Sequence, residues 1–161
     1  MTMDPALKRR ATRFVLLTVL IYSMGFGIIM PVLPDLIKHL AHVDSAEAAR
    51  IGAWIGATYG LFQILLMPAV GNLGDRFGRR PIFLVSLFAF GFDFLLMGLA
   101  PSIGWLFVGR AIAGGLGAVF GPANAAMADM SSPEERAASF GKVGAAFGLG
   151  FIFGPVIGGL L

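Results

Sequence analysis

The amino-acid sequence predicts an all-α protein that crosses a membrane several times. Hydrophobic residues make up 57% of the 161 residues and charged residues only 13%, about half the charged share of a typical soluble domain. The apolar residues form five runs, and the basic residues gather near the ends of these runs. Backbone groups in hydrocarbon need internal partners, so continuous apolar runs of this length are expected to be helices. A membrane-spanning strand would instead alternate polar and apolar residues.

Each run approaches or exceeds the roughly 20 residues that a helix needs to cross the hydrocarbon core. Residues 1–13 precede the first run as a short basic segment, and residues 14–161 contain all five runs. Pro31 and Pro34 predict a kink or an early end in the first helix. We expect spanning helices at approximately 14–38, 51–73, 82–100, 104–128 and 139–161.

The positions of the basic residues predict the orientation of the chain. One side of the predicted membrane has nine Lys and Arg residues, whereas the other has only Lys38 and Arg50; Arg110 lies inside a span and is not counted. Basic loops stay in the cytoplasm, so we expect a multi-pass membrane protein with a cytoplasmic N-terminus. The nine residues on the basic side are Lys8, Arg9, Arg10, Arg13, Arg76, Arg79, Arg80, Arg136 and Lys142.

Several functional classes find no support in the sequence. There is no cysteine and no G-x-x-x-x-G-K-[ST] phosphate loop. In "GLGFIFG" the third glycine is misplaced for a dinucleotide site, and no strand precedes it. His39, His42 and Asp44 offer too few ligands for a metal site. The basic residues are not interleaved with aromatic residues as nucleic-acid binding favours. We therefore expect no enzyme, cofactor, metal or nucleic-acid partner.

Two ionisable residues lie inside predicted spans. Asp93 and Arg110 flank the loop near residues 101–102 at similar separations, so each should lie roughly 12–13 Å from the same helix ends on antiparallel helices. Charges inside a membrane are costly and indicate function. Direct pairing would lock the two helices together. Alternatively, Asp93 is protonated and Arg110 faces a central cavity, where both would serve proton coupling or substrate binding.

The second span carries a smaller polar group. Gln63 lies one helical turn after Tyr59, and these side chains are candidates for hydrogen bonding to a polar substrate. A hydrogen bond from Gln63 to a neighbouring helix explains the same residue equally well.

The loop "GNLGDRFGRRP" (71–81) combines glycines with charges between the second and third spans. Its glycines permit a tight turn and close helix approach, and Pro81 suits the first turn of a helix. The three arginines would hold the loop inside the cell, but this role does not explain the glycine spacing.

This loop resembles the signature loop of the major facilitator superfamily of transporters. Two further stretches, "GFGIIMPVLP" (25–34) and "LFVGRAIAGGLGA" (106–118), resemble its first-helix and fourth-helix motifs. The glycine series of the fifth span is similar to the motif associated with its proton-coupled drug antiporters, and the tetracycline efflux branch is the most similar. The matching loop residues are Gly71, Leu73, Asp75, Arg76, Gly78, Arg79 and Arg80.

The resemblance implies five helices out of the N-terminal six-helix half of a twelve-helix transporter, with the C-terminal half missing from this chain. It also implies a gating charge network at the ends of the helices and proton coupling by Asp93 and Arg110. The glycine series would pack helices together, because small residues allow close approach. The implied gating residues are Asp75, Arg76, Arg79, Arg80 and Asp129. The packing residues are Gly150, Gly154, Pro155 and Gly158.

The resemblance therefore implies part of a proton-coupled exporter of amphipathic drugs in a bacterial inner membrane, with tetracycline as one candidate. Its partners would be the small-molecule substrate, protons, the lipid bilayer and the missing half. One departure bears on the substrate: tetracycline pumps carry an acidic residue in the first helix where this chain has "YSMG" (22–25). The alternatives are a metabolite facilitator or symporter of the same superfamily, and a membrane fragment that does not transport.

Overall fold

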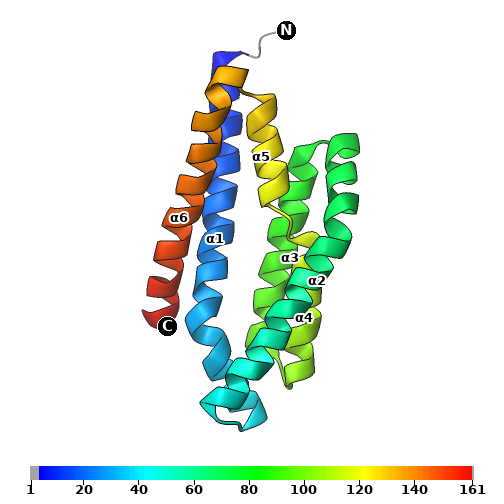
Figure 1. Ribbon diagram of the computed structural model, residues 1–161, viewed down its shortest axis with the longest axis vertical. Coiled ribbons are helices and arrows are strands. Elements are labelled where there is room, and N and C mark those ends of the chain that lie inside the picture. The colour runs from blue at the N-terminus through cyan, green and yellow to red at the C-terminus, as the bar shows by residue number, and fades with distance from the viewer. Residues whose placement is uncertain (1–3, 161) are drawn as a thin grey trace.

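The computed structural model describes residues 4–160, and every regular element within this range is a helix (Figure 1). Five helices are long and apolar enough to span a membrane, with α4 and α5 together forming the fourth. The predicted all-α membrane fold with five spans is therefore confirmed. The elements are α1 (Pro5–Ala41), α2 (Ser45–Phe77), α3 (Arg79–Leu99), α4 (Ile103–Leu116), α5 (Phe120–Asp129), η1 (Pro133–Glu135) and α6 (Arg136–Leu160).

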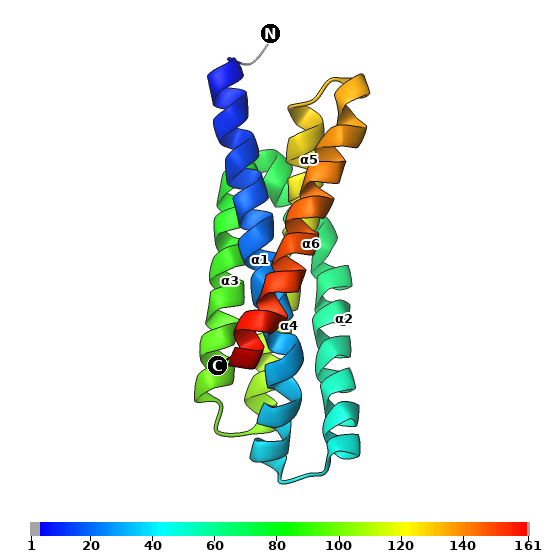
Figure 2. The ribbon, with the colours of Figure 1, turned by 90° about the vertical axis from the view of Figure 1, so that its left-hand side faces the viewer.

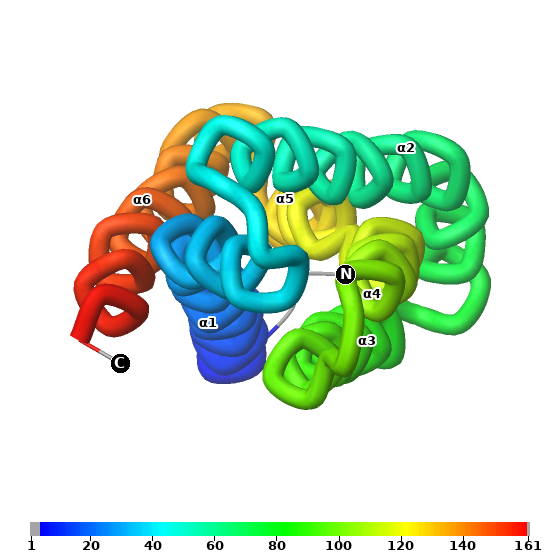
Figure 3. Tube along the Cα trace, turned by 90° about the horizontal axis from the view of Figure 1, so that it is seen from below, coloured from blue at the N-terminus to red at the C-terminus, as the bar shows by residue number. Residues whose placement is uncertain are grey.

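Successive spans run in opposite directions, so the connections gather at two ends of the bundle (Figures 1 and 2). The basic end holds the start of α1, the α2–α3 junction and the α5–η1 connection. The opposite end holds the α1–α2 and α3–α4 connections. Viewed along the bundle, α1 and α6 form one side, and α2, α3 and α4 form the other, with α5 between them (Figure 3).

Helices α1 and α6 pack closely because glycines of α6 face the α1 backbone. A methyl group on Gly158 would come within 2.8 Å of the Ile28 carbonyl oxygen, and one on Gly154 within 2.7 Å of the Gly27 Cα. Gly150 lies in the same way against Leu20, where an added methyl would be 2.6 Å from the carbonyl oxygen. These three glycines are buried and Pro155 lies inside the helix beside them. The glycine series thus forms the contact between the first and fifth spans.

A single residue, Gly78, joins α2 to α3. Its backbone has φ of 88°, a conformation that glycine adopts without the steric penalty of a Cβ. Gly71 and Gly74, by contrast, lie inside α2. The tight turn therefore depends on Gly78, whereas Gly74 is buried and would keep ordinary contact with Ile82 on α3 even with a methyl group added.

The fourth span is broken, which the sequence-based prediction of one helix over 104–128 did not anticipate. Helix α4 ends at Leu116 and α5 begins at Phe120. The amide of Gly117 donates to the Ala113 carbonyl at 2.7 Å, and that of Val119 donates to the Gly117 carbonyl at 2.9 Å. The chain thus tightens locally before it resumes as α5.

The first helix does not end early at its prolines. Pro31 and Pro34 lie inside α1, which continues to Ala41. The predicted early end is therefore wrong. Helices of membrane proteins tolerate proline because neighbouring helices and local adjustments satisfy the freed backbone groups.

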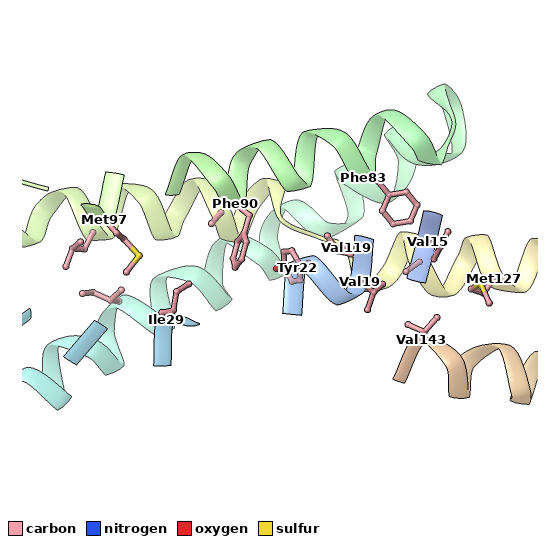
Figure 4. Packing of buried hydrophobic residues seen from close by; sticks show 14 of the residues in the cluster. Val15, Val19, Tyr22, Ile29, Phe83, Phe90, Met97, Val119, Met127 and Val143 are labelled. Carbon is pink, nitrogen blue, oxygen red and sulfur yellow. The ribbon is translucent and has the colours of Figure 1, made fainter. Parts of the chain in front are cut away.

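The buried core follows the inner face of α1. Val15, Val19 and Tyr22 lie along this face and meet Phe83 and Phe90 of α3 (Figure 4). The rings of Tyr22 and Phe90 have centroids 4.5 Å apart. A polar hydroxyl thus reaches the centre of an otherwise apolar core, and its partners form part of the site described next.

Candidate functional site

Asp93 on α3 and Arg110 on α4 form a direct ion pair in the interior of the bundle. The Arg110 Nε donates to the Asp93 Oδ1 at 3.3 Å, and its terminal nitrogen pairs with Oδ2. Both residues are buried, with 0% of Asp93 and 4% of Arg110 exposed. Of the two arrangements that the sequence left open, the structure has direct pairing.

Neighbouring residues contact both members of this ion pair. Gly109 lies against the carboxylate, and a methyl group there would be 2.5 Å from the Asp93 Oδ1. On the other side, the guanidinium contacts the Met97 sulfur at 3.8 Å and lies over the rings of Tyr59 and Phe90, 5.7 and 5.9 Å from their centroids. Such cation–π contacts stabilise a desolvated guanidinium.

A short hydrogen-bonded chain extends from this cluster across two helices. The hydroxyls of Tyr22 on α1 and Tyr59 on α2 lie 2.5 Å apart, and the Gln63 Nε2 donates to the Tyr59 oxygen at 3.2 Å. Gln63 therefore bonds within its own helix. Tyr59 is the common member, because it contacts Arg110, Tyr22 and Gln63.

A cavity of about 330 Å³ opens between α1 and α2 toward the opposite end of the bundle. Its walls are mostly apolar, and its polar groups come from Tyr59 and Arg110. Predominantly apolar pockets with a few placed polar groups are typical of small-molecule sites. Gln63 does not line this cavity.

A second ionic cluster lies at the basic end. The Arg79 guanidinium reaches Asp129 at the end of α5, with both its Nε and a terminal nitrogen 3.0 Å from Oδ2. It also lies 3.3 Å from the Asp75 Oδ1. Arg79 thus joins α2, α3 and α5, and both carboxylates remain largely exposed.

The neighbouring charges differ in their contacts. Arg76 lies over the ring of Phe77 at 5.5 Å, and Arg80 forms no ion pair with any residue of 4–160. A separate pair joins Lys8 of α1 to Glu135 of η1 at 2.9 Å. The basic end is therefore held by three ion pairs that cross between elements.

Sequence reasoning missed four residues that shape these clusters. Ser86 is fully buried and donates to the Leu116 carbonyl at 2.7 Å, which is freed where α4 ends. Helix α3 thereby holds the broken fourth span at three points: Arg79, Ser86 and Asp93. A buried serine in an apolar run was the only signal of this role. The other missed residues are Tyr22, Met97 and Gly109.

The family model of the Major Facilitator Superfamily matches residues 15–161. The chain belongs to this superfamily. Together with the five spanning helices, this membership makes it a multi-pass membrane protein.

Within the superfamily, the chain is similar to drug-resistance proteins of bacteria. It is 44% identical over 144 residues to the tetracycline resistance protein, class C, of Escherichia coli, covering 89% of this chain and 36% of that protein. It is 40% identical over 149 residues to the class B protein of the same organism, covering 92% and 37%. Multidrug resistance protein 2 of Bacillus subtilis (strain 168) is 29% identical over 162 residues, covering 99% and 39%. The chain thus spans less than half the length of these superfamily members.

One solved structure has a similar arrangement of helices. The crystal structure of the human organic anion transporter MFSD10 (TETRAN) matches with a TM-score of 0.83 and 24% sequence identity, covering 99% of this chain and 42% of that chain. At this identity the likeness concerns the fold.

Proposed function

We propose that this chain forms the N-terminal part of a proton-coupled exporter of amphipathic drugs in a bacterial inner membrane. The substrate would bind between two halves of the complete protein, and rocking of the halves would expose it to each side in turn. The similarity to tetracycline and multidrug resistance proteins supports a drug as substrate. Membership of the Major Facilitator Superfamily supports transport rather than catalysis.

The observation that carries this proposal is the buried pair of Asp93 and Arg110 beside a largely apolar cavity. Arg110 belongs to both, because it pairs with Asp93 and also lines the cavity. A proton that binds Asp93 removes the negative charge opposite Arg110. The guanidinium is then left as an uncompensated cation, held by Tyr59 and Phe90 and exposed to the cavity.

Proton release and substrate binding are coupled in this scheme. A substrate that occupies the cavity beside Tyr59 confines the guanidinium and favours its return to the ionised carboxylate, which expels the proton. Inward movement of one proton contributes roughly 2.3 kcal/mol per 100 mV of membrane potential. Exchange of an incoming proton for an outgoing drug thus supplies work for export.

The basic-end cluster would act as the gate. With a cytoplasmic N-terminus, the contact of Arg79 with Asp75 and Asp129 lies at the cytoplasmic ends of the helices and stabilises the state that is closed to the inside. Arg76 and Arg80 would hold the same loop against the membrane surface. Domain rocking of this kind breaks and forms interface salt bridges.

The test is substrate-induced proton movement in inverted membrane vesicles that contain the full-length transporter. The vesicles are energised, and tetracycline and a panel of amphipathic drugs are added while the internal pH is followed. We expect at least one drug to release protons from the vesicles. Vesicles without the transporter are the control. Transport of a drug without any proton movement would refute coupling, and a response to metabolites alone would favour a metabolite carrier.

A further inference from the structure

We propose that a second cavity, at the basic end, is a binding site for an anionic phospholipid. This cavity of about 500 Å³ lies among α1, α3 and α5. It is separate from the cavity beside Arg110 and shares no lining residue with it. We call it the basic-end cavity; its lining includes Leu7, Phe14, Arg79, Arg80, Phe83 and Met130.

The basic-end cavity lies where the spanning helices meet their polar ends. On α1 the lining runs from Leu7 in the basic segment to Phe14 at the start of the apolar run, and on α3 it runs from Arg79 and Arg80 to Phe83. One part of the cavity is therefore at the level of lipid headgroups, and the other is at the level of the upper acyl chains. A phospholipid has the same division along its length.

The charge at the polar part of the cavity is positive. The lining has one carboxylate, Asp129, which is paired with Arg79, as is Asp75 beside it. Arg80, by contrast, is exposed and forms no ion pair within the described residues, so it is the cation that remains open to a ligand. Helix α3 also begins here, and no side chain caps its first turn, so its amides present a partial positive charge. Arg10 lies three residues after Leu7 and four before Phe14, a spacing that places it beside the same face of α1. This arrangement complements a phosphate group.

The rest of the lining is apolar. Leu7 is 55% exposed and Phe14 37% exposed, so both present surface that an acyl chain can cover. A free phosphate ion would gain nothing from these side chains, whereas a phospholipid would satisfy the arginine and cover the apolar wall together. The basic residues and the apolar wall together therefore favour a phospholipid over a free anion. Basic pockets between spanning helices bind anionic headgroups by this chemistry.

The test is a lipid titration of the purified full-length transporter in detergent, followed by native mass spectrometry. Phosphatidylglycerol is compared with phosphatidylcholine of the same acyl chains, for the parent protein and for Arg80→Gln. We expect tighter binding of phosphatidylglycerol and a loss of about fivefold in Arg80→Gln, the factor that corresponds to about 1 kcal/mol for one basic residue at a membrane surface. Arg50→Gln is the matched control, because Arg50 is exposed at the opposite end, and its affinity should be unchanged.

Two further variants and a competition with inorganic phosphate test the proposal in other ways. Leu7→Asn removes apolar wall without touching the charge and should weaken binding of phosphatidylglycerol, whereas Arg80→Lys should retain most of it. Inorganic phosphate, added in excess, should not displace the lipid. Equal affinity for the two lipids, or equal loss in Arg80→Gln and Arg50→Gln, would overturn the proposal. Displacement by phosphate together with an inert Leu7→Asn would reduce the site to one for a small anion.

Discussion

Two ionic clusters on α3 have the same chemistry in opposite surroundings. The side chains of Asp93 and Arg110 are 0% and 5% exposed, whereas the Asp129 side chain that pairs with Arg79 is 63% exposed. Breaking a buried pair leaves a charge without compensation and costs about 3–5 kcal/mol, while exposed pairs contribute about 0–1 kcal/mol. In the proposed mechanism, the buried pair therefore changes partners only when a proton neutralises it, and the exposed cluster breaks readily in each transport cycle.

The largest effect should come from removing one partner of the buried pair. Arg110→Ala leaves Asp93 as an unpaired buried carboxylate, so we expect a loss of about 3–5 kcal/mol in the free energy of unfolding in mixed micelles. Adding Asp93→Asn to this variant should restore much of the loss, because no charge is then stranded. Arg50→Ala should be nearly neutral. If Arg110→Ala were as mild as Arg50→Ala, the contrast between the two clusters would fail.

A smaller effect should follow from crowding the buried carboxylate. Gly109→Ala places a methyl group 2.5 Å from the Asp93 Oδ1, and overpacking of this kind costs about 1–3 kcal/mol. The matched control is Gly98→Ala on α3, where a methyl group meets nothing within 4 Å. The same unfolding measurement compares them. Equal stabilities of the two variants would contradict the observed approach of Asp93 to α4.

Ser86 connects the two clusters through the break in the fourth span. Ser86→Ala removes the donor to the Leu116 carbonyl and leaves that oxygen without this partner, so we expect a loss of about 1–3 kcal/mol in unfolding free energy. Hydrogen exchange of the amides at 117–123 should also increase. Thr58→Ala is the control, since Thr58 is only half-buried and donates to the Trp54 carbonyl within its own helix. Unchanged exchange in Ser86→Ala would show that the serine does not hold the break.

The smallest effect on stability should come from the exposed cluster. Asp129→Asn removes the partner of Arg79 and should change the unfolding free energy by about 0.2–1 kcal/mol. This difference should disappear in 1 M salt, where the screening length is about 3 Å. The effect of Arg110→Ala should persist in the same buffer. If Asp129→Asn lost much unfolding free energy, and lost it equally at high salt, the ion pair of Arg79 and Asp129 would behave as a buried pair and the contrast would fail.

Hydropathy and charge placement were sufficient to predict the five spans, because the bilayer imposes length and composition on each helix. The similar depths of Asp93 and Arg110 in the membrane could also be predicted, because helical rise converts sequence separation into distance. A single apolar run does not determine how a helix is rotated about its axis. Which residues pair and which residues line the cavity could therefore be learned only from the structure.

The break at Gly117 escaped prediction for a related reason. The run "AGGLGA" (113–118) is as apolar as the spans around it, and its glycines fit close packing as well as a change of backbone path. Only the arrangement of α3 beside it, with Ser86 facing the Leu116 carbonyl, distinguishes these two roles. The ionic cluster around Arg79 was predicted through the resemblance of its loop, and the structure shows the contact between Arg79 and Asp129. Its role as a gate stays a proposal.

The most direct test of the central claim is the ionisation of Asp93 during substrate binding. Infrared difference spectra are recorded for the full-length transporter with and without a transported drug, for the parent protein and for Asp93→Asn. We expect the drug to remove a protonated carboxyl band in the parent protein, and we expect Asp93→Asn to lack this change. Identical difference spectra of the two proteins, with protons still released on binding, would show that another group carries the proton.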